Sequence, residues 1–300
     1  MHSYQIISDS SCDLPAELLR TLQVGIVPYY ASFDTVQYHK ELLELTAETF
    51  YDRIQNSSVF PKTSLPPISD YMDVFEPYLK AGKDVLCICL TSKFSGSYQS
   101  AHNAKQILLE TYPQRRIEVL DSINVTATQG MLVREACRMR DAGYDLDRLI
   151  AVLQQLKHTS KIYFTVDSLQ FLQHGGRVGK AAALAGALLN IKPIIAMKEG
   201  ELFPERKVRG HKKALKTLLE MTQADLSAQK ERYQLCVIRA GKELEAEAQS
   251  LIAALSAEGY AVEPKPWTIG VTIGTHAGPT AIGICYMQPY ETIAPAAAQP

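Results

Sequence analysis

The sequence predicts an α/β protein in two parts: an N-terminal Rossmann-like domain with a parallel sheet, then a C-terminal α+β domain with a mostly antiparallel sheet. Three observations lead to this prediction. The 300 residues exceed the usual size of one domain, and 46% hydrophobic residues can build two cores. Apolar runs alternate with helical segments up to residue 160, as in a parallel sheet covered by helices. Beyond residue 160 a hairpin pattern replaces this alternation.

The N-terminal part, residues 1–160, consists of repeated strand, polar loop and helix. Short apolar runs predict strands at 4–7, 24–31, 84–90 and 117–120. Asp13 and Pro15 predict an N-cap and first turn of a helix, and Gly82 closes a helix that begins near Ser69. Further helices are expected from about 46 and at 98–110, 126–141 and 145–157. Polar loops follow several strands, where parallel sheets bind their ligands.

The C-terminal part, residues 161–290, has a different pattern. Strands are expected at 161–166, 192–197, 202–204, 233–239 and 281–287, with the second and third forming a hairpin. Helices are expected at 168–174, 178–190, 208–221 and 244–258; the second is rich in Ala and Gly and the third is basic. Residues 291–300 are predicted to be a flexible tail.

Composition excludes several classes of protein. A net charge of −1 provides no overall field for nucleic acid. The longest apolar stretch, at 181–189, is shorter than the roughly 18 residues of a membrane span, and the first residues lack a signal-peptide pattern, so we expect a cytoplasmic, soluble protein. Six cysteines without a CxxC pair predict buried, reduced thiols. Cys12 lies in a polar turn, either as a reactive thiol or as a small turn residue.

Two serine- and threonine-containing segments are candidates for binding an anion. Thr63 and Ser64 precede Pro66-Pro67, which stiffens the backbone and holds the hydroxyls in place; the alternative is a cap for the following helix. The segment 91–100 follows the most strand-like run, and places Ser95 and Gly96 at the start of a helix, where an anion is favoured. Ordinary helix capping is the alternative there.

Two glycine-containing segments add candidate donors. Gly175 and Gly176 form a tight turn that presents Arg177, whose guanidinium can donate two parallel hydrogen bonds to a carboxylate or phosphate. His276 lies among glycines in the segment 270–279, read as a shaped loop. Close packing of the glycines and a structural or solvated histidine are the alternatives. No cluster of His, Cys, Asp and Glu predicts a metal site.

Together these segments resemble the DegV family, the fatty-acid-binding subunits of bacterial fatty acid kinase. The resemblance covers nearly the whole chain and rests on the order of its motifs, which are Asp9-Ser10-Ser11-Cys12-Asp13-Leu14-Pro15, Thr63-Ser64-x-Pro66, Ser95-Gly96-Ser97-Tyr98-Gln99-Ser100-Ala101, Gly175-Gly176-Arg177, Asn190-Ile191-Lys192-Pro193-Ile194 and His276-x-Gly278-Pro279. Two departures, Pro67 after the TSxP motif and Thr280 after the HxGP motif, affect residues beside the expected pocket.

The resemblance implies a long-chain fatty acid held between the two domains, with no other cofactor. Thr63 and Ser95 would hydrogen-bond the carboxylate, and Arg177 and His276 would complete the polar end. Supporting positions behind them are expected to be Ser64, Gly96, Asp9 and Ser10. The resemblance further implies that the protein is not itself an enzyme: a separate ATP-dependent kinase subunit phosphorylates the ligand for phospholipid synthesis.

A dense basic segment stands apart from these motifs. We expect it to dock an acidic kinase subunit or to touch the phosphate being transferred, the alternative being a solvated helix face. Its cations are Arg206, Lys207, Arg209, Lys212 and Lys213. Two other functions compete with the carrier. A serine hydrolase acting on a lipid ester would use Ser95 and His276 with Asp9 or Asp121 as the orienting acid. A nucleotide-dependent enzyme would need a phosphate loop, which the sequence lacks.

Overall fold

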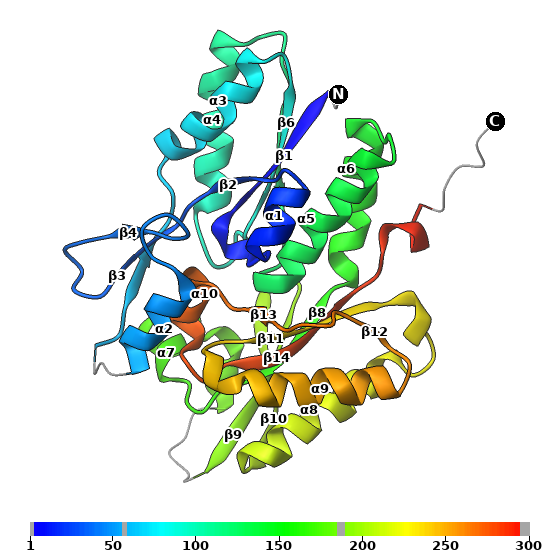
Figure 1. Ribbon diagram of the computed structural model, residues 1–300. Helices are drawn as coiled ribbons and strands as arrows, with labels where there is room; N and C mark the ends of the chain where they lie inside the picture. The colour runs from blue at the N-terminus through cyan, green and yellow to red at the C-terminus, as the bar shows by residue number, and fades with distance from the viewer. Residues whose placement is uncertain (1–2, 56–58, 185–189, 295–300) are drawn as a thin grey trace.

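The computed structural model of the chain describes residues 3–55, 59–184 and 190–294. Its two main sheets lie one above the other in Figure 1. All strands of the first precede residue 160, and all strands of the second follow it. Residue 160 therefore lies between the last strand of the first sheet, which ends at Asp121, and the first strand of the second, which begins at Lys161.

The N-terminal sheet is entirely parallel, with strand order β2-β1-β6-β7. Its strands are β1 (Tyr4–Asp9), β2 (Gly25–Val27), β6 (Asp84–Cys89) and β7 (Ile117–Asp121). Side chains alternate between two helical layers: Ile7 and Cys87 pack with α3 and α4, whereas Ile6 and Leu86 face the core that contains α5 and α6. The helices are α1 (Ala16–Thr21), α3 (Ile68–Lys80), α4 (Ser97–Thr111), α5 (Thr126–Asp141) and α6 (Leu146–Leu156).

The C-terminal sheet is mostly antiparallel, as predicted. The order is β10-β9-β8-β14-β11-β12, with β13 also paired to β11; only β12 and β13 run parallel to their neighbour. Its strands are β8 (Lys161–Thr165), β9 (Ile191–Lys198), β10 (Glu201–Arg209), β11 (Gln234–Arg239), β12 (Ala261–Val262), β13 (Trp267–Thr268) and β14 (Ile282–Met287). Helices α8 (His211–Leu226) and α9 (Glu245–Ala257) cover one face, and the other face turns toward the N-terminal domain (Figure 1).

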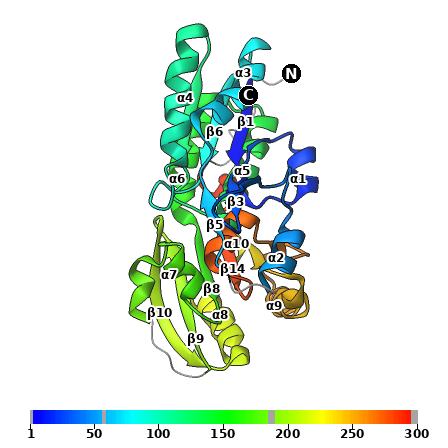
Figure 2. The same ribbon diagram turned by 90° about the vertical axis from the view of Figure 1, so that its left-hand side faces the viewer.

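A small third sheet was not predicted; it lies at the left of Figure 1 and below β1 in Figure 2. It contains β3 (Tyr30–Ser32), β4 (His39–Lys40) and β5 (Lys62–Ser64), in the antiparallel order β4-β3-β5. The apolar run at 24–31 is therefore two strands, because Pro28, which has no N–H for a ladder, separates β2 from β3. Helix α2 (Ala47–Gln55) follows β4, close to its predicted start.

Four predictions about local structure were wrong. Asp13 does not cap a helix: it ends the 3₁₀ turn η1 (Ser10–Cys12) with φ 49°, and α1 starts only after Pro15. In the predicted helix at 178–190, the described part is the 3₁₀ segment η3 (Gly179–Leu184), while residues 185–189 lie outside the described ranges. The basic helix starts at His211, because Arg206, Lys207 and Arg209 continue β10. His276 lies on helix α10 (Val271–Ala277), not in a loop.

The remaining short elements complete the chain. They are α7 (Gln170–His174) and the 3₁₀ turns η2 (Lys157–Thr159), η4 (Lys230–Arg232), η5 (Lys242–Leu244) and η6 (Tyr290–Thr292). In the predicted tail, Glu291 pairs with Arg138 and Ala294 packs on the core, while 295–300 lie outside the described residues. Among the helices described here, none is both long and apolar enough to cross a membrane.

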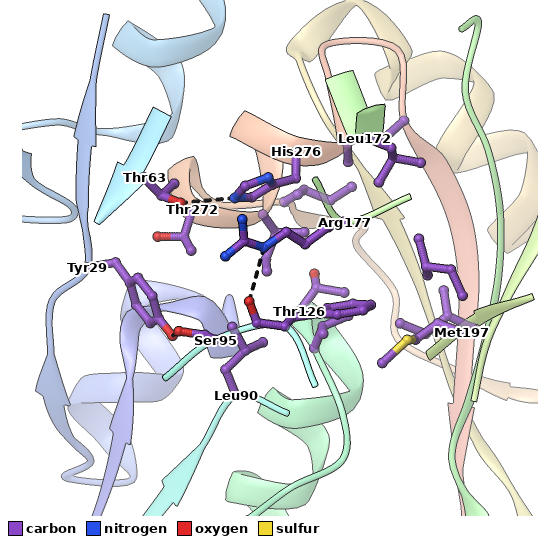
Figure 3. Close-up of a pocket in the computed structure, with 18 of the residues that line it drawn as sticks. Tyr29, Thr63, Leu90, Ser95, Thr126, Leu172, Arg177, Met197, Thr272 and His276 are labelled. Carbon is purple, nitrogen blue, oxygen red and sulfur yellow. Dashed lines mark hydrogen bonds between the residues drawn. The ribbon is translucent and has the colours of Figure 1, made fainter. Parts of the chain in front are cut away.

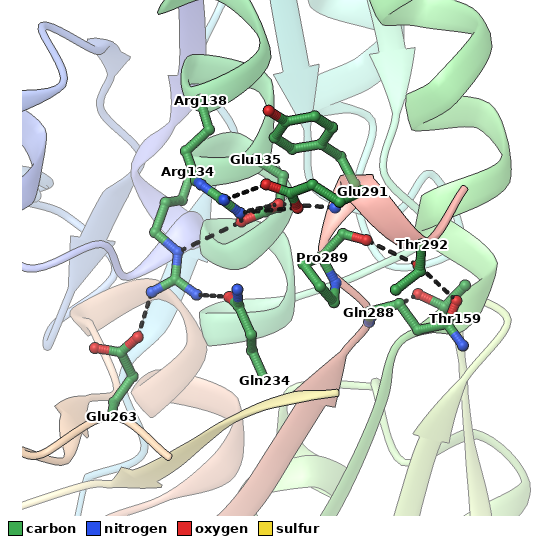
Figure 4. A network of polar contacts seen from close by, with 11 residues as sticks. Arg134, Glu135, Arg138, Thr159, Gln234, Glu263, Gln288, Pro289, Glu291 and Thr292 are labelled. Carbon is green, nitrogen blue, oxygen red and sulfur yellow. Dashed lines mark hydrogen bonds and ion pairs between the residues drawn. The ribbon is translucent and has the colours of Figure 1, made fainter. Parts of the chain in front are cut away.

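A polar network joins α5 to the C-terminal domain (Figure 4). Arg134 bonds Glu263 and donates to Gln234 at 2.6 Å. Glu135, fully buried, accepts two hydrogen bonds from Arg138, of 2.7 and 2.9 Å, and one from the Tyr290 amide at 2.9 Å. These residues lie about two to three helical turns along α5 from Thr126. The network therefore fixes the two domains relative to each other.

Candidate functional site

A cavity of about 260 Å³ lies between the two domains. One wall is the inner face of the C-terminal sheet, where Leu202, Met197 and Ile162 lie side by side in the strand register. Phe164 and Ile238 lie in a neighbouring row, on either side of Gly283. The opposite wall is formed by residues that follow strands of the N-terminal sheet, including Tyr29 after β2, Leu90 after β6 and Val125 after β7. The cavity is therefore at the carboxyl edge of the parallel sheet, as predicted.

Thr63 and His276 meet at one end of the cavity (Figure 3). Thr63 lies on β5, where pairing with Ala31 of β3 holds its backbone, and His276 lies on α10. The Thr63 hydroxyl and Nε2 of His276 are 2.9 Å apart. Residues 213 positions apart in the chain thus form one polar contact between the domains. Thr63 is not a helix cap, since α3 begins after Pro67 without a side-chain cap.

The environment of His276 keeps its ring neutral. Burial, and secondarily the nearby charge of Arg177, lower the pKa of His276 from 6.5 to about 4. Its Nδ1 has no hydrogen-bond partner and lies against Gly175, where a Cβ would be only 2.0 Å away. Because Nδ1 has no acceptor to donate to, we assign the proton to Nε2, which then donates to Thr63. The Thr63 hydroxyl proton is left to donate into the cavity.

The hydroxyl of Ser95, like that of Thr63, accepts hydrogen bonds from neighbouring residues and keeps its own proton for the cavity. The Tyr29 hydroxyl donates to Ser95 Oγ at 2.8 Å, and the Ser97 amide donates to the same oxygen at 3.2 Å. Tyr29 is only 2% exposed, and burial raises its pKa well above the usual value, so it remains a protonated donor. Since Ser95 Oγ already accepts two hydrogen bonds, its own proton is free for a ligand.

Arg177 closes the polar end from the C-terminal domain. Its Nε donates to the Phe94 carbonyl at 3.0 Å (Figure 3), and its Nη1 donates to the Gly175 carbonyl at 2.7 Å. Because a guanidinium has five N–H donors, others remain for hydrogen bonds to a ligand. Gly176, with φ +68°, supplies the left-handed residue of the predicted turn. Gly175 is needed for a different reason, since any side chain there would collide with His276.

The predicted supporting residues occupy different places. Ser64 lines the cavity, whereas Asp9, Ser10 and Gly96 lie behind it. Asp9 is fully buried and accepts from Ser11, Ser97, Gln129 and the Leu90 amide, which ties β1 to the start of α4. Ser10 accepts from the Tyr29 amide at 2.9 Å. Gly96 is the residue before α4, close to Leu65.

The hydrolase alternative is not supported by this geometry. Ser95 is bonded to Tyr29, and His276 to Thr63. Within the described ranges no carboxylate partners Nδ1 of His276, as a catalytic triad requires, and the lowered pKa makes the ring a weak base. Asp9 is occupied as described above, and Asp121 accepts from the Ser92 and Ile123 amides.

Several site residues were missed in the sequence. Tyr29 lies in the unpredicted break between β2 and β3, and Thr272 lies on the unpredicted helix α10. The apolar wall was easier to predict from the sequence, because the alternation of residues in β8 already places Ile162 and Phe164 on one face. That this face would meet the N-terminal domain follows only from the tertiary structure.

Neither a metal nor a reactive thiol is indicated. No group of three or more potential metal ligands occurs within the described residues. All six cysteines are free and buried. Cys12 is 1% exposed, and burial raises the pKa of its thiol, so the reactive-thiol interpretation of Cys12 was wrong.

Fold and site together define a class of protein: a two-domain α/β protein with an apolar interdomain cavity that ends in hydrogen-bond donors. The sequence model described as "Uncharacterised protein, DegV family" matches residues 3–288. The chain therefore belongs to the DegV family. Protein DegV of Bacillus subtilis is 32% identical over 284 residues, covering 94% of this chain and 98% of that protein.

Solved structures of the family have the same fold. A stearic acid-binding protein from Eubacterium ventriosum is 35% identical, with a TM-score of 0.91 and coverage of 96% of this chain and 99% of that one. A DegV family protein from Thermus thermophilus, whose structure is described as showing fatty acid binding, is 30% identical, with a TM-score of 0.86 and coverage of 96% and 100%.

Proposed function

We propose that this protein binds a long-chain fatty acid between its domains. One observation carries the proposal: an apolar cavity ends where the donors Thr63, Ser95 and Arg177 converge from both domains, with His276 in contact with Thr63. Fatty acid binding by relatives of 30% and 35% identity supports it. Each buried methylene contributes about 0.8 kcal/mol, so an acyl chain with roughly ten methylenes or more offsets the entropic cost of binding.

Each polar residue has a different role in binding the carboxylate. Thr63 and Ser95 donate their free hydroxyl protons, and Arg177 adds a charge-assisted hydrogen bond. His276 acts through Thr63, by orienting its hydroxyl. Neutral His276 adds no charge, so the compensating cation for the carboxylate is Arg177.

Binding is tested by native mass spectrometry of the purified protein, followed by extraction and identification of the released ligand. We expect one fatty acid per chain. Protein that carries no lipid and also takes up no added oleate would overturn the proposal. Ligand that is retained undiminished after Ser95→Ala and Thr63→Val would instead show that the carboxylate lies elsewhere.

We further propose that the bound carboxylate is presented to a separate ATP-dependent kinase subunit for acyl phosphate formation. The family resemblance motivates this role, and the site lacks a triad of its own. The docking surface proposed for the kinase is basic: Arg206, Lys207 and Arg209 lie exposed on β10, and Lys212 and Lys213 lie exposed at the start of α8. Exposed cations favour an acidic partner.

Charge reversal tests this docking surface. Arg206→Glu, Arg209→Glu and Lys213→Glu together should abolish kinase-dependent phosphorylation while fatty acid binding persists. The matched control reverses three exposed cations at other positions: Lys80→Glu, Lys93→Glu and Lys265→Glu. Equal phosphorylation in both triple variants would contradict docking at β10 and α8.

A further inference from the structure

Two carboxyl groups are buried together behind the polar end of the cavity. Glu41 is 1% exposed and Asp13 is 9% exposed. Oδ1 of Asp13 and Oε1 of Glu41 both lie within 2.6 Å of the point where a Cβ of residue 270 would be, so only glycine at 270 allows them to approach each other there. Burial of one such group is costly, and burial of two in contact is costlier.

The two carboxyl groups differ in their hydrogen bonds. Glu41 accepts from the hydroxyls of Ser10 and Thr272, each at 2.6 Å, and from the Thr272 amide at 3.1 Å. Neither oxygen of Asp13 has a partner in good hydrogen-bond geometry, although the Thr126 hydroxyl and the Gly270 amide lie close enough to lower its pKa in part. Well-aligned donors favour an ionised carboxylate, and poorly aligned ones leave a protonated carboxyl favoured. Burial raises the pKa of both groups. At Asp13 the neighbouring charge of Glu41 raises the pKa further, well above its usual value, whereas at Glu41 the hydrogen bonds from Ser10 and Thr272 oppose the rise. Glu41 therefore holds the charge and Asp13 the proton.

Other titratable groups around the pair do not neutralise it. The charge of Asp13 or Glu41 raises the pKa of three neighbouring groups, which are Cys12, Tyr51 and Cys285. The charge of Asp9 in turn raises the pKa of Asp13. All are acids, and in the described part of the chain no Lys or Arg forms an ion pair with Asp13 or Glu41. Arg239 influences Tyr51 alone among them. The proton on Asp13 thus limits the charge of the pair to that of Glu41.

Glu41 is linked by hydrogen bonds to the surroundings of both proposed hydroxyl donors, Ser95 and Thr63. Through Ser10, which accepts from the Tyr29 amide, it reaches Tyr29, and Tyr29 donates to Ser95. Through Thr272 it holds the first turn of α10, and His276 lies four residues further on the same helix face, where it contacts Thr63. The backbone amide of Glu41 also donates to the Tyr29 carbonyl at 2.9 Å.

We infer that ionised Glu41 is a positioning residue of the ligand site, which holds Ser95 and Thr63 at the spacing that a carboxylate head group requires. The inference rests on the proposed function. Glu41 touches no ligand: it is absent from the cavity lining, and it acts through Tyr29 and Thr272, which line the cavity. The residue determines head-group recognition and leaves the acyl wall unaffected.

The test compares oleic acid with oleyl alcohol, which has the same chain and no carboxylate, by isothermal titration calorimetry. Glu41→Gln should weaken oleic acid binding at least tenfold and oleyl alcohol binding less than threefold. Ser10→Ala, which removes one of the connections, should shift the same ratio in the same direction by a smaller factor. Glu44→Gln, an exposed carboxylate in the same loop, is the matched control and should change neither affinity.

Two results would overturn the inference. Equal loss of both affinities in Glu41→Gln and Ser10→Ala would show a merely structural role, and unchanged affinities in both would show no role. Asp13→Asn, which mimics the protonated acid, should retain the oleic acid to oleyl alcohol ratio; a loss as large as in Glu41→Gln would contradict the placement of the proton. Wild-type protein that binds neither ligand would overturn the proposed function itself.

Discussion

The two domains meet through two contacts of opposite character. Along α5, Arg134, Glu135 and Arg138 are all paired, and Glu135 is fully buried (Figure 4). At the polar end of the cavity, Arg177 reaches the Phe94 carbonyl and Thr63 contacts His276 through one hydrogen bond each, beside an unpartnered Nδ1 (Figure 3). We infer that the contact along α5 stabilises the arrangement of the two domains, whereas the contact around the cavity keeps hydrogen-bond donors available for a ligand.

The largest effect is expected at His276 when the pH falls. Its folded-state pKa, about 4, lies below the ordinary 6.5, so between these values the unfolded chain binds a proton that the folded protein does not. The free energy of unfolding should therefore decrease by up to about 3 kcal/mol from pH 6.5 to 4, and this contribution is fully present above pH 6.5. Urea unfolding at both pH values, compared with His276→Gln, isolates it; parallel losses in the two proteins would contradict it.

The α5 contact should show its effect in stability. Glu135→Gln removes the buried charge that Arg138 and the Tyr290 amide share, and should lower the free energy of unfolding by about 2 kcal/mol. Glu291→Gln is the control: Glu291 pairs with the same arginine but is 41% exposed, so a loss below about 0.5 kcal/mol is expected. Equal losses in urea unfolding would mean that burial does not distinguish the two acids.

The cavity contact should instead show its effect in affinity. Thr63→Val and Ser95→Ala each remove one donor to the carboxylate and should weaken oleate binding roughly tenfold, about 1.4 kcal/mol. Ser92→Ala, exposed in the same loop as Ser95 and outside the cavity, should bind as the wild type does. Calorimetric titration measures the oleate affinity of all three variants. If Thr63→Val or Ser95→Ala also lowered the free energy of unfolding by as much as it lowered the binding free energy, the cavity contact would not differ in kind from the α5 contact.

The smallest effect is expected at Tyr29. Tyr29→Phe keeps the ring and removes the hydrogen bond that fixes the Ser95 hydroxyl, so oleate affinity should decrease roughly threefold. Tyr30→Phe removes a comparable hydroxyl, which donates to Asp70 away from the cavity, and should leave affinity unchanged. Equal affinities of the two variants would show that Ser95 needs no orientation by Tyr29.

The regular elements were predictable because their patterns are local. The runs at 84–90 and 117–120 are strands β6 and β7, and Gly82, with φ +79°, ends α3 as predicted. Predictions failed where a long-range contact overrides local preference. Asp13 was read as a helix cap, yet it packs against Glu41 and Gly270, which are distant in sequence. The Gly-rich segment around His276 was read as a loop, but it forms α10, and Glu41 accepts hydrogen bonds from Thr272 in the first turn of that helix.

The sequence by itself determined the two-domain α/β architecture and which side chains are chemically suited to hold an anion, because hydrophobic periodicity and residue type are local properties. Only the tertiary structure decided how these side chains are used. It joined Thr63 to His276, Tyr29 to Ser95 and Arg177 to the Phe94 carbonyl. Such pairs depend on how β5, α10 and the loop after β6 pack together, and packing is a property of the whole chain.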